Sequence, residues 1–425
     1  MKKYCKLLLL ILVASMLFSG CVMRTVDELY CLPKRSQADD DMQAVIDQAM
    51  VGMSYCAPID GANRQMVQTA DLDGDGIDEY VVLARDSAQQ KLKILIFGQY
   101  ALGYALTDTI EGFGFAFDFI EYANVDDHPG AEIIVGRQAG DGGVRSAAAY
   151  RYVEGKTQQL LEASYSKFLT CDIDTDGRSE MIAIHPSETG HVISTTVLYR
   201  YEGGRIHECS KLAISVSADN ITKMEPIILQ DKNLAIMVIS EENNSQIMEI
   251  FAIQGEEMNH VYGPTSVARL RNHFVYPMDV DQDGDTEFPE LLPMRGGDDG
   301  DSWILWFGVN AQGQRIDGMF TYYSYADKWY MHMDRSWVKE LTVTRSEGIC
   351  TFSNQKKEVV MTIYALTGVN RKEQAQQLGG VILGSSESIT FAATVGPGAK
   401  SLGITENRVK QLFYAIDLQL YTQKE

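Results

Sequence analysis

The chain has 425 residues, and its 58 acidic against 37 basic side chains give a formal net charge of −21 at pH 7. Such an acidic chain repels the phosphates of nucleic acid and of anionic lipid, so we expect no nucleic-acid partner and no polybasic membrane contact. Seven cysteines without a Cys-x-x-Cys pair exclude a disulfide-built scaffold, and we assign no disulfide.

The first 20 residues have the pattern of a secretory signal. Three lysines precede an apolar run over residues 7–18, and Ser19 and Gly20 stand directly before Cys21. Small residues before a cysteine resemble the lipobox of bacterial lipoproteins, in which that cysteine is diacylated and becomes the new N-terminus. We therefore expect a signal peptide over residues 1–20 and a lipid on Cys21 that anchors the exported protein at the extracytoplasmic face of the membrane. The alternative is an ordinary signal peptide or uncleaved anchor with an incidental cysteine.

The next residues lead from the membrane to the folded part. Residues 21–38 are polar and mixed, which is typical of a tether. Residues 39–60 are predicted to form a short helix and a lead-in, because Asp39, Asp40 and Asp41 favour a helix start and apolar residues follow at helical spacing.

A nine-residue acidic pattern recurs along the central part of the chain. Carboxylates at positions 1, 3, 5 and 9, with a glycine at position 6 for the sharp turn, can wrap oxygen ligands around one hard cation of the Ca²⁺ type. Full copies begin at Asp71, Asp172 and Asp279. A worn copy begins at Asn124 and has His128 and Pro129 at positions 5 and 6, so we expect it to hold no calcium.

The spacing of these loops indicates a repeat of roughly 50 residues. The gap before Asp279 spans two periods, and Glu225 to Ile239 in its middle is predicted to be a fifth repeat, whose shortened turn at 230–233 has lost the metal loop. About four short strands rich in Val, Ile, Tyr and Phe fall in each unit. Such sheets bury both faces only when neighbours stack on them, which predicts a mainly β fold with a β-propeller over residues 61–335, of five to seven blades.

These units resemble FG-GAP or VCBS repeats, the calcium-loop blades of integrin head domains and of many bacterial surface proteins. The order of lipobox, helix, repeats and C-terminal piece is also similar to uncharacterised VCBS-repeat lipoproteins of Gram-positive bacteria. In the family, the metal is bound by positions 1, 3, 5 and 9 and by the backbone carbonyl of position 7. The resemblance implies structural Ca²⁺ at three ligand sets: Asp71, Asp73, Asp75, Ile77 and Glu79; Asp172, Asp174, Asp176, Arg178 and Glu180; and Asp279, Asp281, Asp283, Asp285 and Glu287.

The loops allow two other interpretations. The segment from Asp279 to Glu290 satisfies the EF-hand formula, but Pro277 and Pro289 leave no room for flanking helices. An acidic hairpin without metal is the second alternative. It is disfavoured because several like charges in one turn repel unless a cation neutralises them.

Beyond the repeats, residues 336–425 are predicted to form a small α+β domain. Five strands, a helix at 371–378 and a final helix capped by Thr405 that continues to Leu420 are expected. Aromatic residues gather between Trp303 and Trp337, where they could form a platform for sugars or peptides. Packing in the core is the preferred interpretation.

No catalytic motif of the common hydrolases, metalloproteases or nucleotide-binding enzymes occurs. We therefore expect a lipid-anchored, calcium-stabilised binding or scaffold protein of the bacterial cell surface, with an unknown protein or glycan ligand, and leave open whether it is an enzyme. The alternative is a hydrolase or lyase acting on cell-envelope or dietary polysaccharide, since a carboxylate pair for glycoside cleavage is invisible in sequence. An assembly lipoprotein that holds partner proteins is a third possibility.

Overall fold

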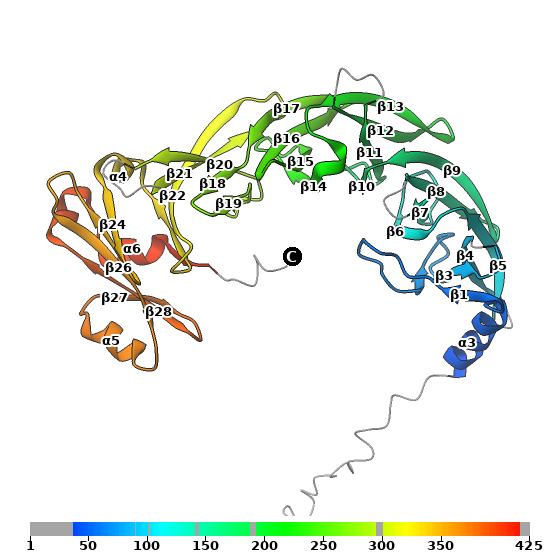
Figure 1. The fold of residues 1–425 in the computed structure, drawn as a ribbon, viewed down its shortest axis with the longest axis horizontal. Helices are drawn as coiled ribbons and strands as arrows, with labels where there is room; N and C mark the ends of the chain where they lie inside the picture. Colours follow the sequence, from blue (N-terminus) through cyan, green and yellow to red (C-terminus); the bar gives the residue numbers. More distant parts are fainter. Residues whose placement is uncertain are drawn as a thin grey trace, which may run out of the picture.

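The computed structural model describes residues 37–89, 91–100, 103–140, 144–187, 193–294 and 301–416. The predicted signal peptide, the predicted lipidation site Cys21 and nearly all of the predicted tether lie outside these residues. Within them the chain is built mainly of antiparallel β-sheets that follow one another along an arc (Figure 1).

A helix opens the folded part and covers the first sheet. The helix α3 (Gln37–Ala49) begins two residues before Asp39, which confirms the predicted helix. Its apolar face places Met42 and Ile46 in one buried cluster with Val82, Leu95 and Phe97 of the first sheet. The helix thereby shields the outward face of that sheet from water.

Five sheets follow in chain order, each built from consecutive antiparallel strands. The first sheet contains β1 (Met53–Tyr55), β2 (Val67–Ala70), β3 (Glu79–Asp86), β4 (Leu92–Tyr100) and β5 (Gly103–Gly112). The second contains β6 (Ala116–Ala123), β7 (Glu132–Gln138), β8 (Arg145–Val153) and β9 (Lys156–Tyr165). The third contains β10 (Lys167–Cys171), β11 (Glu180–Pro186), β12 (Ser194–Glu202) and β13 (Arg205–Ile214).

After the 3-10 turn η1 (Ala218–Asn220), the fourth sheet contains β14 (Ile221–Ile228), β15 (Leu234–Glu242), β16 (Ser245–Gln254) and β17 (Glu257–Ser266). A small hairpin of β18 (Ala268–Leu270) and β19 (His273–Val275) leads to the fifth sheet, which contains β20 (Phe288–Pro293), β21 (Ser302–Val309), β22 (Arg315–Ser324) and β23 (Trp329–Met333).

The fourth sheet confirms the strand repeat predicted near Glu225. Strands β14 and β15 pair from Met224↔Val238 to Ile228↔Leu234 and are joined by a turn of residues 229–233, in the place where other sheets carry a nine-residue acidic loop. The repeat period in the sequence therefore corresponds to one sheet per unit.

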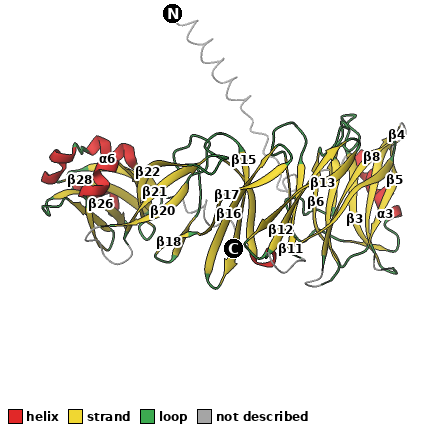
Figure 2. Cartoon of the chain, turned by 90° about the horizontal axis from the view of Figure 1, so that it is seen from above, coloured by secondary structure: helices red, strands yellow, loops and turns green. Residues whose placement is uncertain are grey.

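Successive sheets are held together by buried apolar clusters between their faces. Alternate side chains of a strand point to opposite faces of its sheet. In β3, Val82 packs in the cluster with α3, whereas Val81 and Leu83 pack in the cluster shared with the second sheet. Further clusters join the second and third, third and fourth, and fourth and fifth sheets. Seen from above, the strands of these sheets stand side by side in a row (Figure 2).

The row of sheets forms an open arc, and no closed ring is present in the described residues (Figure 1). The sequence predicts a propeller because every sheet must bury both faces. Here the two terminal faces are covered by other elements instead, because α3 packs on the first sheet and the C-terminal region packs on the fifth. Capped ends remove the need for closure.

The C-terminal region forms the five-stranded sheet β24-β25-β26-β28-β27 with short helices against it. Its strands are β24 (Thr342–Ser346), β25 (Ile349–Ser353), β26 (Val359–Thr367), β27 (Val381–Ser385) and β28 (Ile389–Val395). Its helices are α4 (Arg335–Glu340), α5 (Arg371–Gln377), the 3-10 helix η2 (Pro397–Leu402) and α6 (Glu406–Leu412). The hydroxyl of Thr405 accepts from the backbone N–H of Arg408, as the predicted cap requires.

The predicted final helix is too long. Helix α6 ends at Leu412, and Phe413 begins a strand, β29 (Phe413–Ala415), that pairs with β23 of the fifth sheet. The ring of Phe413 stacks on that of Trp329, so burial of the aromatic side chain replaces further helical turns.

The aromatic residues near Trp303 pack in the core, which is the interpretation preferred over a platform for sugars or peptides. Trp303, Tyr322, Trp329 and Trp337 are each 2% exposed or less and share one cluster with strands of the C-terminal sheet. The cysteines at 56, 171, 209 and 350 are free thiols. Among the described residues, no helix is long and apolar enough to cross a membrane.

Candidate metal centres

The three full acidic loops, which begin at Asp71, Asp172 and Asp279, share one backbone conformation. Position 2 carries a buried apolar side chain: Leu72, Ile173 or Val280. Positions 4 and 6 both have positive φ, with glycine at position 6 in every loop. Glycine adopts this backbone without steric cost, which allows the turn to fold back on its own acidic side chains.

Two hydrogen bonds hold the carboxylates in the same place in each loop. The glutamate at position 9 accepts from the backbone N–H of position 2, at 2.9 Å for Glu79, 3.0 Å for Glu180 and 2.9 Å for Glu287. The aspartate at position 1 accepts from the backbone N–H of the position-6 glycine, at 3.0 Å in all three. Strands β3, β11 and β20 begin at or beside this glutamate, so the sheet fixes one end of the site.

The structure brings together three of the predicted ligands in each loop. Carboxylate oxygens of positions 1, 3 and 9 lie within 4.8 Å of one another, in the groups Asp71, Asp73 and Glu79; Asp172, Asp174 and Glu180; and Asp279, Asp281 and Glu287. Oxygen donors this close are suited to one shared hard cation. These groups consist of carboxylates alone, so the structure shows acidic sites that could hold a metal ion.

The position-5 aspartates are not part of these groups. Each accepts instead from the backbone N–H of position 7, at 2.8 Å for Asp75, 2.8 Å for Asp176 and 2.9 Å for Asp283. At position 7 itself, the side chain of Ile77 is exposed and that of Asp285 is buried. Arg178 at this position reaches Asp176 and Asp127 of the neighbouring loop.

Burial disfavours the charged form of the position-9 glutamate in each loop. Burial, with the surrounding aspartates, raises the pKa of Glu79 to about 7, and the same causes raise the pKa of Glu287 to about 7. Burial also raises the pKa of Glu180, but there the Arg200 guanidinium opposes the rise. A bound cation would relieve this repulsion, because it favours the ionised carboxylates.

In the worn loop at Asn124, an arginine of the adjacent strand pairs with the position-3 aspartate. Glu132 still accepts from the N–H of Val125 at 2.8 Å, so the backbone pattern survives. Asp126, whose side chain is fully buried, forms an ion pair with Arg151 of β8. The Arg151 guanidinium also donates to the hydroxyl of Tyr201 at 3.1 Å. The charge of Asp126 is therefore neutralised by an arginine of the protein itself.

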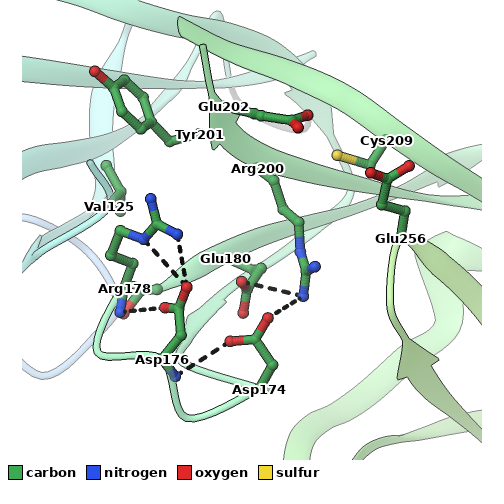
Figure 3. A pocket seen from close by; sticks show the side chains of 11 residues that line it. Val125, Asp174, Asp176, Arg178, Glu180, Arg200, Tyr201, Glu202, Cys209 and Glu256 are labelled. Atoms are coloured by element: carbon green, nitrogen blue, oxygen red, sulfur yellow. Dashed lines mark hydrogen bonds and ion pairs between the residues drawn. The ribbon is translucent and has the colours of Figure 1, made fainter. Parts of the chain in front are cut away.

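The Asp172 loop also receives an arginine, which sequence reasoning missed. Arg200 of β12 lies 2.7 Å from an oxygen of Asp174 and 3.3 Å from one of Glu180 (Figure 3). In Figure 3 its guanidinium points between these two carboxylates. The signal that could have found it is a repeated Tyr-Arg-Tyr in the third strands of two units, at 150–152 and 199–201.

The Asp279 loop is approached by a lysine from the turn of the fourth sheet. The Lys232 ammonium lies 2.6 Å from the carboxylate of Asp285 and 3.0 Å from the backbone oxygen of Asp283. Within the part of the chain that the structure describes, no salt bridge reaches Asp279, Asp281 or Glu287.

Neighbouring loops are joined by backbone hydrogen bonds along one edge of the arc. The N–H of position 8 donates to a carbonyl oxygen of the preceding unit: Ala131 to Asp71 at 3.0 Å, Ser179 to Asn124 at 2.7 Å and Thr286 to Ile228 at 2.8 Å. Close packing accompanies this, since a Cβ on Gly74 would lie 2.6 Å from Pro129. A change in the conformation of one loop would therefore alter the contact between two neighbouring sheets.

No protein-family model matches the chain, and no curated protein matches it. Among solved structures it is similar to an exotype rhamnogalacturonan lyase, YesX, with 10% identity and a TM-score of 0.29 over 72% of this chain and 62% of the lyase. It is also similar to rhamnogalacturonan lyase PL11 of Bacillus licheniformis, with 12% identity and a TM-score of 0.25 over 66% of this chain and 47% of that one. The chain spans less than two thirds of either lyase, and TM-scores this low carry no inference about its function.

Proposed function

We propose that this protein is a calcium-stabilised, lipid-anchored binding or scaffold protein at the extracytoplasmic face of a bacterial cell membrane, built from FG-GAP or VCBS-type repeats. The observation that carries the proposal is the set of three matched acidic loops, each of which gathers carboxylates at the same place in the first, third and fifth sheets. Repetition of one loop geometry is typical of a structural cation site rather than of a single catalytic centre.

The donor chemistry supports Ca²⁺ over other cations. The grouped side chains are all carboxylates on a flexible turn, and Ca²⁺ accepts six to eight such hard oxygens in irregular geometry. Mg²⁺ demands a near-ideal octahedron and retains several waters, and transition metals favour nitrogen or sulfur ligands. Extracellular calcium would be available to an exported protein.

The arc supports the role of a binder. Curved stacks of repeated units present long concave surfaces, and such surfaces are what repeat proteins use to hold partners. An acidic chain favours a protein or glycan partner and disfavours nucleic acid. The anchor is proposed on the Lys-rich start, the apolar run and the Ser-Gly-Cys sequence that ends at Cys21.

Fractionation of cells that express the full chain tests the anchor. The wild type should enter the membrane fraction and incorporate labelled fatty acid, whereas Cys21→Ala should do neither. Equal labelling of both chains would refute lipidation at Cys21.

A ligand screen tests the binding role. The mature protein would be offered to arrayed glycans and to envelope extracts in Ca²⁺, with new reducing ends and unsaturated sugar products monitored at the same time. Saturable binding without turnover supports the proposal. Turnover that follows the protein through purification would favour the polysaccharide lyase or hydrolase instead.

A further inference from the structure

We infer that Arg200 is a built-in counter-ion that occupies the Asp172 loop, so that the chain binds two divalent cations, at the Asp71 and Asp279 loops, and not three. The inference rests on the calcium sites of the proposed function and concerns which of them a metal can enter. Its basis is the residue that stands across the sheet from the position-9 glutamate.

The pairing of the strand that begins at this glutamate with the next strand along the chain decides that residue. In the third sheet Met181 pairs with Tyr199, which places Arg200 across from Glu180. In the second sheet Ile133 pairs with Tyr150, which places Arg151 across from Glu132. Both arginines therefore emerge from the same site of their sheets, directly beside the loop carboxylates.

The first and fifth sheets carry glycine at this site. Tyr80 pairs with Phe97, so Gly98 stands across from Glu79. Phe288 pairs with Phe307, so Gly308 stands across from Glu287. Neither residue has a side chain that could enter its loop, and no salt bridge among the described residues reaches the grouped carboxylates of these two loops.

The space beside both glycines is taken by polar groups of the neighbouring sheet. A Cβ on Gly98 would lie 3.2 Å from the hydroxyl of Tyr152, and one on Gly308 would lie 2.0 Å from the amide oxygen of Gln230. That amide oxygen is buried and has no hydrogen-bond partner among the described residues. Close packing of this kind favours glycine at both sites, and without a side chain there the carboxylates stay open to an external cation.

Arg200 is held firmly in the Asp172 loop. Its side chain is 17% exposed, and besides Asp174 and Glu180 it donates to the backbone oxygen of Gly255 in the fourth sheet at 2.8 Å. Figure 3 shows the guanidinium beside two of the three grouped carboxylates. A divalent cation would have to displace a charge-assisted, multiply bonded guanidinium from the same oxygens.

In the worn loop the arginine is present and a ligand carboxylate has also been lost. There Arg151 is paired with buried Asp126, and position 1 has become Asn124, which no longer supplies a carboxylate. The Asp172 loop retains all its acids but already contains the arginine. The four loops thus fall into two open ones with glycine and two filled ones with arginine.

Calcium stoichiometry of the mature protein tests the inference. Equilibrium dialysis and calorimetric titration should give two ions for the wild type. Asp73→Asn in the open first loop should reduce this to one, whereas the matched Asp174→Asn in the filled loop should leave two. Arg200→Gly should raise the number to three, and Arg205→Gly, which removes an exposed arginine of the same sheet, should leave two.

Three bound ions in the wild type, or one in Asp174→Asn, would overturn the inference and leave the calcium sites of the proposed function standing. Two ions in a folded Arg200→Gly chain would also overturn it. If Arg200→Gly does not fold, the pair of asparagine variants decides the matter. No bound ion in any chain would refute the proposed calcium sites and the inference together.

Discussion

The Asp71 and Asp172 loops have the same acidic spacing and the same backbone hydrogen bonds, yet they differ in what surrounds their charge. In the first, five acidic side chains fall within nine residues, and Gly98 stands across from Glu79. In the second, Arg200 binds Asp174 and Glu180, while Arg178 binds Asp176. The nine-residue pattern therefore specifies the shape of the loop, and a residue on the adjacent strand specifies its counter-ion. Variants that exchange or remove the counter-ions can break or sharpen this comparison.

The largest effect is expected where an arginine is buried most completely. Arg151→Met would leave Asp126, with a fully buried side chain, without its ion pair. Removing one partner of a buried pair costs about 3 to 5 kcal/mol, because the remaining charge is desolvated without compensation. Urea unfolding should show a loss of this size, and the exposed-site control Arg205→Met should change stability little. Equal effects of the two variants would contradict the assigned role of Arg151.

Chelation should act on the open loops. A cation that binds only the folded chain stabilises it by about 2.7 kcal/mol per site when the free ion is at 100 times its Kd. Ethylene glycol tetraacetate should therefore lower the thermal midpoint of the wild type, and Asp73→Asn should show about half of that shift. A midpoint that does not respond to chelation would mean that the loops hold no stabilising metal.

The next variant transfers the counter-ion from one loop to another. Gly98→Arg should neutralise the Asp71 loop and remove its share of the response to chelation, whereas Gly98→Ala should keep the response. Both variants lose some stability, since a Cβ at 98 would lie 3.0 Å from Thr107. The comparison with alanine separates this steric cost from the effect of charge. A full calcium response in a folded Gly98→Arg chain would show that an arginine at this site does not exclude the metal.

Much of the fold could be predicted because its signals are local. The strand around Val81 and Val82 and the turn at Gly76 each follow from residues that are adjacent in sequence. The open arc could not, because it depends on Met42 and Ile46 of α3 covering one end of the row and on the C-terminal sheet covering the other. These are long-range contacts that leave no periodic trace in the sequence.

The candidate sites show the same division. Asp71, Asp73 and Glu79 were identified from spacing alone, and the structure brings their oxygens together. Arg200 was missed because it lies 26 residues beyond Asp174 and meets it only through strand pairing. The final helix was overextended because Phe413 satisfies a helical apolar pattern but packs on Trp329 as part of a strand. Residues that act across strands require the register as well as the pattern.

The smallest expected effect is a pH dependence in the worn loop. Burial, with the neighbouring Asp126 carboxylate, raises the pKa of Glu132 above that of an ordinary glutamate. The folded chain then retains a proton that the unfolded chain loses above about pH 4.5, so this contribution to stability is lost as the pH rises toward the folded-state pKa. Glu132→Gln is neutral in both states and still offers an oxygen to the N–H of Val125.

Between pH 5 and pH 8, the free energy of unfolding should therefore fall by on the order of 1 kcal/mol more in the wild type than in Glu132→Gln. The exposed Glu162 of the same sheet provides the control, and Glu162→Gln should follow the wild type. Denaturant unfolding at several pH values, in a chelator that removes any contribution of the metal loops, measures the difference. Parallel pH profiles for the wild type and Glu132→Gln would mean that the worn loop carries its charge on Glu132 at neutral pH. Arg151 would then balance two buried carboxylates, whereas a steeper wild-type profile indicates that it balances Asp126 alone while Glu132 keeps its proton.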